Sequence, residues 1–428
     1  MTDVRDIARA AVPYGLATVD LHRILVSFAL DPGSPEFKAP MNTLHHSRGL
    51  ADPRDRAVVN LNVDTPYSYA WLDLRGGPVL LTVPDHEPAR YMSAQIVDLY
   101  SYIVGYLSPR TVSPRTPGPR GGAAVIVRGP STPGPDVEAD ATFLCPTELA
   151  LVLVRTQLFD DRDLPAVTEL QDRIVLEPLG PPGEPLDAPA PVDVRDGLDE
   201  RFLEVLDWML HLMPRLPEDT EIRDRLAEIG CGSGRLDVLL RSPSRRQSAR
   251  AGLTEGFGDV VRRSRAVQSS AELFGSREFF AGDHTTRAAG ALLGILGNAA
   301  EEFLGVGYRG DSEGRPFDGH HDYTIRFAPG TLPPVDAFWS ITVYDAEQHL
   351  YANELDRYVL GSRQLDSMTR DADGSLTILL RHRRPAPELV ANWLPCPRAP
   401  FGLVFRTYLP REVICSRAWS APPVIRTS

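Results

Sequence analysis

The chain has 428 residues, which is enough to bury more than one sizeable core. Its composition, 43% hydrophobic and 24% charged, is that of an ordinary globular protein. The formal net charge of −12 argues against a nucleic-acid-binding protein, and arginine supplies nearly all of the positive charge.

The first part of the chain is predicted to be helical and then to form strands. Apolar residues at helical spacing across Val4–Leu30 predict a helix that Pro13 and Gly15 kink or divide in two. Short β-rich runs bounded by Gly or Pro predict strands between Val58 and Val127. Within this region, the Pro-, Arg- and Gly-rich segment Ser108–Gly122 is interpreted as a long loop or lid.

The middle of the chain is predicted to be mainly helical. Patterns typical of helices occur at 147–157, 163–172, 198–213, 218–229, 246–274 and 285–304. The Pro-rich stretch Leu179–Ala190 is the best internal boundary. Strand character returns near the C-terminus, in the runs 323–327, 337–344, 375–380 and 401–408.

This order of elements predicts an α+β fold with two antiparallel β-sandwich-like regions separated by a helical insert. We expect an N-terminal helical segment at 1–50, a first β-sandwich region at 51–180, the helical insert at 181–310 and a C-terminal β-sandwich region at 311–428. An internal echo suggests that the two sheet regions are related. Residues 90–98 resemble residues 337–345, because each run begins with an aromatic residue and a Ser and ends at an Asp.

The cysteines and the N-terminus bear on location. The four cysteines, at 145, 231, 396 and 415, lie far apart without Cys-x-x-Cys spacing, so reduced thiols are expected. The N-terminal residues contain no basic region followed by an apolar core, and the longest apolar run, Ala288–Leu296, is too short to span a bilayer. We therefore expect a cytoplasmic protein with no membrane partner.

Two sets of residues carry a family resemblance. In the first half they are Asn62-x-Asp64-Thr65-x-Tyr67-Ser68, Trp71-Leu72-Asp73-Leu74, Gly77-Pro78-Val79, Val83-Pro84, Arg90-Tyr91 and Asp98. In the second half they are Gly314-x-Pro316-x-Asp318-Gly319, Tyr323, Pro333-Pro334, Phe338-Trp339-Ser340, Tyr344-Asp345, Asn353-x-x-x-Arg357-Tyr358, Asp373-Gly374-Ser375, Asn392-Trp393-Leu394-Pro395 and Arg406-x-Tyr408. On these residues the first half resembles domain of unknown function 1254, and the second half resembles its usual companion, domain of unknown function 1214. The resemblance implies a β-sandwich architecture with a helical insert, and it implies no particular reaction.

The polar stretch from Asn62 to Tyr67 is the strongest candidate site. Asn, Asp and Thr also favour turns, so a purely structural role is an equal alternative. In the functional interpretation, Asp64 is a general base or a substrate anchor, and Tyr67 donates a hydrogen bond. The loop with His45 and His46 leads toward this stretch, which makes either histidine a candidate acid–base group.

Further residues are candidates for substrate binding. They are Asn62, Arg90, Tyr91, Trp339, Trp393, Arg406 and Tyr408. At positions i and i+2 of a strand, Arg406 and Tyr408 share one sheet face and could clamp a carboxylate or stabilise an oxyanion. For the arginines the alternative is an ion pair with a buried Asp such as Asp98 or Asp345. For the tryptophans the alternative is a place in the core.

No metal or organic cofactor is expected. Adjacent histidines in an extended strand point to opposite faces, so neither His45–His46 nor His320–His321 would chelate as a pair. The sequence predicts an enzyme that uses acid–base chemistry, namely hydrolysis, elimination, isomerisation or cyclisation, on a small to medium organic metabolite bound between the β regions. The alternative is a non-catalytic protein that binds a small molecule, a sugar or a lipid. Homo-oligomerisation is left open.

Overall fold

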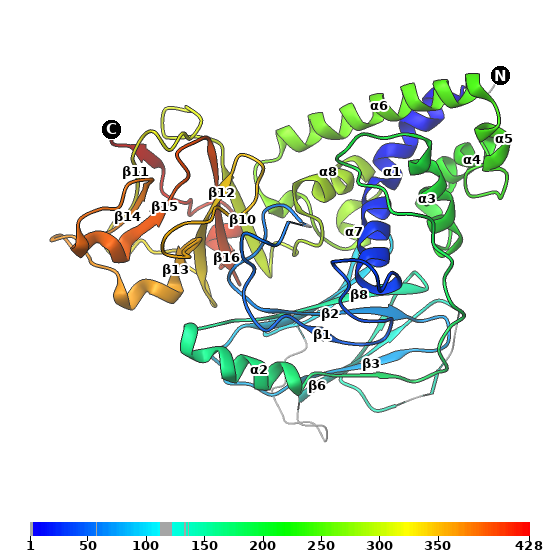
Figure 1. The fold of residues 1–428 in the computed structure, drawn as a ribbon. Helices are drawn as coiled ribbons and strands as arrows, with labels where there is room; N and C mark the ends of the chain where they lie inside the picture. Colours follow the sequence, from blue (N-terminus) through cyan, green and yellow to red (C-terminus); the bar gives the residue numbers. More distant parts are fainter. Residues whose placement is uncertain (1–2, 57, 112–121, 132–133, 136) are drawn as a thin grey trace.

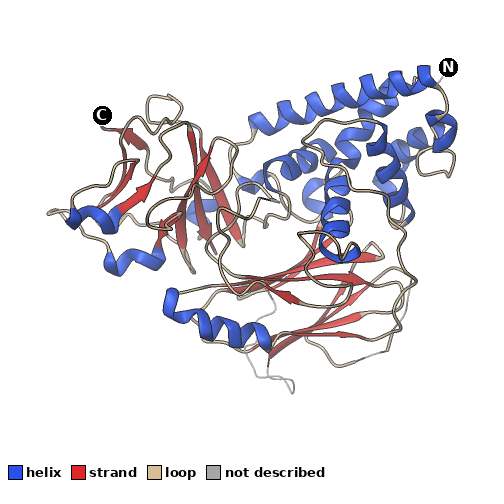
Figure 2. Cartoon of the chain, in the orientation of Figure 1, coloured by secondary structure: helices blue, strands red, loops and turns tan. Residues whose placement is uncertain are grey.

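The computed structural model describes residues 3–56, 58–111, 122–131, 134–135 and 137–428. A first β-sandwich, a group of helices and a second β-sandwich make up the molecule, and the α+β fold predicted from the sequence is confirmed (Figure 1). The strands gather in two blocks, and most helices lie above the first block (Figure 2). Most of the loop or lid predicted at 108–122 lies outside the described residues.

The first β-sandwich pairs a five-stranded sheet with a four-stranded sheet. The five-stranded sheet has the order β1 (His45–His46), β2 (Tyr67–Asp73), β8 (Leu149–Thr156), β4 (Met92–Asp98) and β5 (Ile103–Leu107). The four-stranded sheet has the order β7 (Ala141–Leu144), β6 (Gly122–Arg128), β3 (Val79–Pro84) and β9 (Val175–Pro178). Side chains of β8 alternate between two cores: Leu151 and Leu153 pack toward the helices, whereas Val152 and Val154 pack inside the sandwich.

The helix predicted at Thr147–Gln157 is wrong, because this segment forms strand β8 in the interior of the sheet. All residues of β8 are buried, since helices cover one face of the sheet and the second sheet covers the other. A strand that is buried on both faces has no alternation of polar and apolar residues. Its short apolar run therefore cannot be told from a buried helix by periodicity.

Helix α1 (Val4–Leu25) continues as a π-helix over Val26–Leu30. The others are α2 (Leu164–Asp172), α3 (Glu200–His211), α4 (Thr220–Glu228), α5 (Leu236–Leu240), α6 (Pro243–Ala266), α7 (Arg277–Phe280), α8 (His284–Gly294) and α9 (Glu412–Cys415). Of these, α3, α4, α6 and α8 pack against α1. Of the two alternatives predicted at Pro13 and Gly15, the division into two helices is wrong, because α1 runs through both residues. Pro13 removes the N–H that would bond the Arg9 carbonyl. That carbonyl lies against α6, where a Cβ added to Gly256 would stand 2.3 Å from it.

The close packing of α6 on α1 leads to a testable difference between two glycines. A Cβ at Gly252 would lie 2.1 Å from the Arg5 carbonyl oxygen, which is backbone and cannot turn aside. We expect Gly252→Ala to lower the free energy of unfolding by about 1–3 kcal/mol, as overpacking does. The control is Gly258→Ala on the same helix, where the nearest atom is an arginine side chain at 3.7 Å. This variant should gain about 0.5–1 kcal/mol. Urea unfolding of both variants tests the pair, and equal stabilities would contradict the close approach.

The second β-sandwich follows the helices and consists of two four-stranded sheets. One sheet has the order β10 (Phe303–Tyr308), β16 (Phe401–Tyr408), β12 (Trp339–Asp345) and β13 (Val359–Gly361). The other has the order β15 (Trp393–Pro395), β14 (Leu376–Arg381), β11 (Tyr323–Phe327) and β17 (Val424–Arg426). The single helix predicted over 285–304 is wrong at its end, since α8 stops at Gly294 and residues from Phe303 onward pair with β16.

The two sandwiches repeat one topology. Strands β2 to β9 of the first correspond in chain order to β10 to β17 of the second, and both pairs of sheets have the same strand order. The directions agree as well, because β6–β7 and β14–β15 are parallel pairs at equivalent places. Strands β4 and β12, which carry the sequence echo, occupy equivalent positions. The chain is therefore an internal duplication, with most of its helices between the two copies.

Candidate functional site

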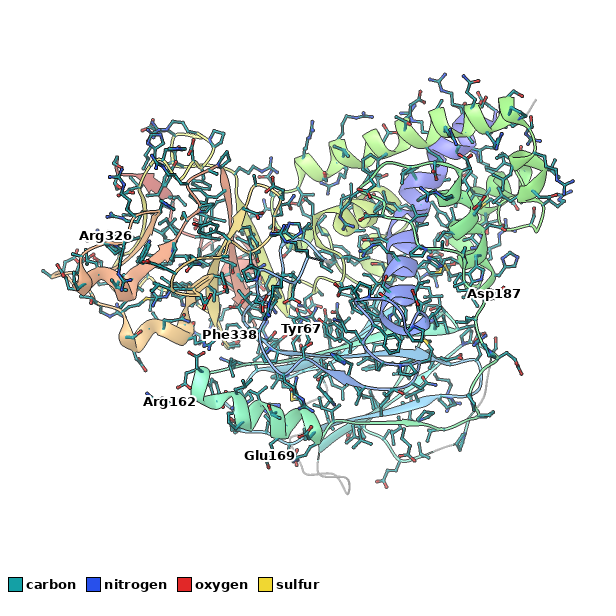
Figure 3. All side chains as sticks on the ribbon, viewed as in Figure 1. Tyr67, Arg162, Glu169, Asp187, Arg326 and Phe338 are labelled. Carbon is teal, nitrogen blue, oxygen red and sulfur yellow. The ribbon has the colours of Figure 1, made fainter. Side chains whose placement is uncertain are left out.

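A cavity of about 800 Å³ lies where the helices and the two sandwiches meet. Tyr67 lies in this central region (Figure 3). Alternate residues of three strands form its walls: Tyr67 and Tyr69 of β2, Leu153 and Arg155 of β8, and Val404, Arg406 and Tyr408 of β16. Because successive strand residues point to opposite faces, the residues between these belong to the sandwich cores. The two sheets thus turn their outer faces toward one cavity.

The Tyr67 hydroxyl is held from two sides. Arg155 donates from Nε at 3.2 Å, and Asn62 donates from Nδ2 at 3.1 Å. A phenol oxygen has two lone pairs and one hydrogen. With both lone pairs engaged, the hydroxyl hydrogen is left to donate to a molecule in the cavity. The Tyr67 ring also lies under the Arg155 guanidinium, 5.2 Å from its carbon, and stacks on Tyr69 at 5.4 Å.

Asn62 explains the spacing of the polar stretch. Its side-chain oxygen accepts from the backbone N–H of Asp64 at 2.6 Å, which closes a local turn. Its amide nitrogen donates to Thr65 Oγ1 at 2.9 Å as well as to Tyr67. Asn62 and Thr65 both line the cavity. The structural and functional interpretations of the stretch 62–67 are therefore compatible, because the turn that Asn62 closes also positions the Tyr67 hydroxyl.

Asp64 lies behind the cavity wall and joins the two sandwiches. Its Oδ2 accepts from Ser340 Oγ at 2.8 Å and from the Tyr408 hydroxyl at 3.1 Å, both in the second copy. Burial raises the pKa of this carboxyl, while the nearby Arg406 guanidinium and the two hydroxyl donors oppose the shift. Tyr408 lines the cavity and Asp64 does not, so this carboxylate would reach a bound molecule only through the phenol.

Arg155 is a buried cation in the cavity wall, with 3% of its surface exposed. Its Nη1 donates to Gln95 Oε1 at 2.8 Å, and its Nη2 donates to the Leu296 carbonyl at 2.9 Å. No carboxylate of the described residues lies within 4.0 Å of it. A buried guanidinium without a counter-ion is costly unless an anion completes its environment. The arrangement therefore suits a negatively charged ligand group.

The structure places His45 and His46 beside strand β2 but outside the lining of the cavity. Both lie on the edge strand β1, where His45 is opposite Tyr69 and His46 is opposite Ser68. His46 Nδ1 is 2.7 Å from Ser68 Oγ, which faces away from the cavity. Burial lowers the pKa of both imidazoles. Neither residue lines the cavity, so the site does not bring them to the predicted acid–base position.

Four predicted ligand-binding residues are engaged elsewhere. Arg90 forms ion pairs with Asp163 and Glu87, which differ from the suggested partners Asp98 and Asp345. The other three are buried: the Tyr91 hydroxyl lies 2.8 Å from Ser93 Oγ and donates to Glu302 Oε2 at 3.3 Å, and Trp339 and Trp393 are 2% and 1% exposed. The alternative for the tryptophans, a place in the core, is where the structure puts them. Asn62, Arg406 and Tyr408 are the predicted ligand-binding residues that reach the cavity.

Sequence reasoning missed Arg155 and its acceptor Gln95. Arg155 lies in the segment whose apolar pattern wrongly predicts a helix. A signal is nevertheless present, because Arg155-Thr156 recurs as Arg406-Thr407, each at the end of an apolar run. Among the residues that the structure describes, no group of three or more His, Cys, Asp or Glu side chains is placed to hold a metal ion. The described helices include none long and apolar enough to cross a membrane.

Comparison with known proteins finds a family match in each half of the chain. Residues 41–178 match the family model "Protein of unknown function (DUF1254)", and residues 304–412 match "Protein of unknown function (DUF1214)". None of the curated proteins compared with the chain matches it. The VPA0106 protein from Vibrio parahaemolyticus has a similar crystal structure, with a TM-score of 0.75 and 23% identity over 99% of this chain and 100% of that chain. A putative uncharacterized protein from Burkholderia cenocepacia has a TM-score of 0.45 and 13% identity, over 96% and 88% of the two chains. The chain thus contains a region that matches the DUF1254 model, followed by a region that matches the DUF1214 model.

Proposed function

We propose that the protein is an enzyme that binds an organic anion in the cavity between the two sandwiches and acts on it by acid–base chemistry without an organic cofactor. One observation carries this proposal. The Tyr67 hydroxyl accepts hydrogen bonds from Arg155 and Asn62, so its own hydrogen is directed to the cavity beside a cation that lacks a carboxylate partner among the described residues.

The chemistry suited to this pair is stabilisation of a developing oxyanion. A carbonyl or carboxylate oxygen of the substrate would accept from an Arg155 N–H and from the Tyr67 hydroxyl. Negative charge would build on this oxygen when a neighbouring carbon gives its proton to a base, for which the cavity lining supplies the carboxylates of Glu36 and Asp55. The fixed donors of the cavity wall would stabilise that charge. Tyr67 would act as the general acid that protonates the oxygen or the leaving group. Isomerisation and elimination next to a carbonyl fit this geometry best.

The remaining walls define the rest of the substrate. Leu153, Ile295 and Phe303 line the cavity and would contact an apolar portion of the molecule. We place the reaction in the cytoplasm, since the four cysteines are free, as is usual in a reducing compartment. The substrate is thus a small to medium organic acid with an apolar part.

The test uses exchange with solvent, which can be measured before the substrate is identified. The protein is incubated in D₂O with a library of carboxylic and keto acids, and mass spectrometry follows deuterium incorporation and product formation. We expect at least one acid to gain deuterium or to be converted at a rate proportional to protein concentration. If acids that bind, as judged by thermal shift, show neither change, proton transfer at carbon is excluded.

A second candidate is a non-catalytic binding protein. It is favoured by one observation: the cavity walls, within the described part of the chain, include no histidine, and the Asp64 carboxylate lies behind Tyr408. The carboxylates that do line the cavity, Glu36 and Asp55, form no ion pair with Arg155 and no hydrogen bond with Tyr67 among the described residues, so no base is fixed beside the proposed oxyanion position. In the same experiment this alternative predicts tight binding of an acid that remains unchanged.

A further inference from the structure

The duplication brings two equivalent arginines to one cavity. Arg155 of β8 is opposite Ser93 of β4, and Arg406 of β16 is opposite Ser340 of β12. These strand pairs are equivalent in the two copies, and both arginines line the same cavity. The segment around each arginine reads Arg-Thr-x-Leu in both copies.

The hydrogen bonds of Arg406 repeat those of Arg155. Nη1 donates to Thr342 Oγ1 at 2.8 Å, and Thr342 occupies the position two residues after Ser340, as Gln95 does after Ser93. Nη2 donates to the Asn60 carbonyl at 2.9 Å and to the Tyr344 hydroxyl at 2.6 Å. Asn60 precedes the first strand of the other copy, as Leu296 does for Arg155. Each guanidinium therefore anchors the loop that enters the opposite sandwich.

Each arginine keeps donors for a ligand. A guanidinium has five N–H groups. Arg155 uses three of them, toward Tyr67, Gln95 and Leu296. Arg406 also uses three, toward Thr342, Asn60 and Tyr344. Within the described part of the chain, two N–H groups on each guanidinium are left: one on each Nη of Arg155, and the Nε–H and one Nη1–H of Arg406. The two that remain on Arg406 point to different sides of the guanidinium, so each would donate a single hydrogen bond to a carboxylate oxygen.

The two cations lack a close counter-charge. No carboxylate of the described residues lies within 4.0 Å of either guanidinium. Asp64 is near enough to Arg406 to affect the pKa of both groups, but its hydrogen bonds go to Ser340 and Tyr408. Two like charges at the wall of one cavity repel each other, and anions between them would relieve that repulsion.

The residue that faces each arginine from the first strand of its copy differs. Tyr67 is opposite Arg155 in the sheet, whereas Gly305 holds the equivalent place opposite Arg406. A Cβ added at Gly305 would meet the Phe303 ring at 3.0 Å, whereas one added at Gly307 would meet no atom within 4 Å. Arg406 also donates to the Tyr344 hydroxyl, but the hydrogen of that phenol goes to the Leu61 carbonyl. The Arg406 end therefore has no counterpart of the Tyr67 hydroxyl that is left to donate to a ligand, and it suits binding more than proton transfer.

We propose that the ligand is a dicarboxylate, with one carboxylate at Arg155 and Tyr67 and the other at Arg406, joined by a largely apolar spacer. This inference rests on the proposed function, because both place an organic anion in the same cavity beside Arg155 and Tyr67. It assigns the reacting end to Arg155 and the anchoring end to Arg406.

The test compares diacids with half-esters. Isothermal titration measures the Kd of α,ω-dicarboxylates of increasing chain length and of their monomethyl esters. We expect one range of lengths to bind best, and the monoester to bind about 10- to 100-fold more weakly, as is typical for loss of a charge-assisted hydrogen-bonded pair. In Arg406→Gln the diacid should bind no better than its monoester. Monoesters that equal diacids at every length would overturn the proposal.

Two variants keep the test independent of folding and of catalysis. Gly307→Val retains both arginines and adds a side chain on a strand where there is room. It should weaken diacid binding while thermal unfolding stays at the wild-type level, and unchanged binding would count against an anchor at this end. Tyr67→Phe should keep the diacid preference while it loses deuterium incorporation. If the wild-type protein prefers diacids to monoesters but incorporates no deuterium, the proposed catalysis is refuted and the dicarboxylate ligand is retained. If it incorporates deuterium but shows no preference for diacids, the dicarboxylate ligand is refuted and the proposed catalysis is retained.

Discussion

Replacing Tyr67 with phenylalanine is expected to lower kcat, or the rate of deuterium incorporation, by about 100- to 10,000-fold, the range typical for a general acid. The substitution removes one oxygen and leaves the ring stacked on Tyr69 and under Arg155. The hydroxyl is held from two sides and is still able to donate a hydrogen into the cavity. The measurement is the initial rate on the best acid found by solvent exchange, together with its Kd.

The matched control is Tyr69→Phe. Tyr69 lies two residues further along β2, lines the same cavity and carries the same hydroxyl on a neighbouring ring. Burial raises the pKa of Tyr69, so its phenol is a poor proton donor at neutral pH. We expect this variant to keep most of the activity. If both variants lose activity to the same extent, the effect comes from a change in the packing of the two rings, and Tyr67 is not the specific proton donor.

Asp98→Asn is expected to stabilise the protein, and the effect should grow with pH. Asp98 ends β4 in a buried position where Oδ1 accepts from the Tyr102 N–H at 2.8 Å and Oδ2 has no partner among the described residues. Burial raises the pKa of this carboxyl from 3.8 to about 7, against the opposing hydrogen bonds and Arg287. Asparagine is uncharged and has nearly the same shape as the protonated acid.

The sign follows from proton linkage. Because the folded protein holds its proton to a higher pH than the unfolded chain, the free energy of unfolding falls as pH rises from about 4 to about 7. The cost at higher pH amounts to about 4 kcal/mol for a shift of this size. Urea unfolding at about pH 5 and about pH 8 should therefore show an advantage of Asp98→Asn that is larger at the higher pH by about 2–3 kcal/mol. A constant difference between the two proteins would contradict the raised pKa.

Local sequence patterns predicted several strands of the second sandwich well. The runs 323–327 and 401–408 coincide with β11 and β16, because their turns contain Gly, Pro and Asp. The patterns failed where burial is complete, since β8 has no polar face to mark it as a strand. The division of the first helix expected at Pro13 does not occur, although the local signal for it is strong. Packing of α6 against α1 outweighs the loss of one backbone hydrogen bond at this proline.

The candidate site was predictable only in part, because it depends on residues far apart in the chain. Asn62 and Tyr67 stand out as a compact polar stretch in the sequence. Arg155, which completes the arrangement, is a single arginine in a chain rich in arginine. Its contact with Tyr67 arises from strand pairing across 88 positions. Only a fold that places β8 beside β2 reveals it.

The reciprocal contacts between the copies have an evolutionary consequence. Asp64, from the first copy, is bound by the second, and Glu302, from the second copy, accepts from Tyr91 of the first. Each copy therefore places a carboxylate against hydroxyl groups of the other, much as the two subunits of a symmetric dimer contact each other reciprocally. A symmetric dimer must change both of its sites together. A fused gene is free of this constraint, and the Tyr67–Gly305 pair is a position where the two copies have diverged. In related sequences, positions that differ between the two copies would mark residues selected for ligand binding. Positions that are the same in both copies would mark residues retained for the fold.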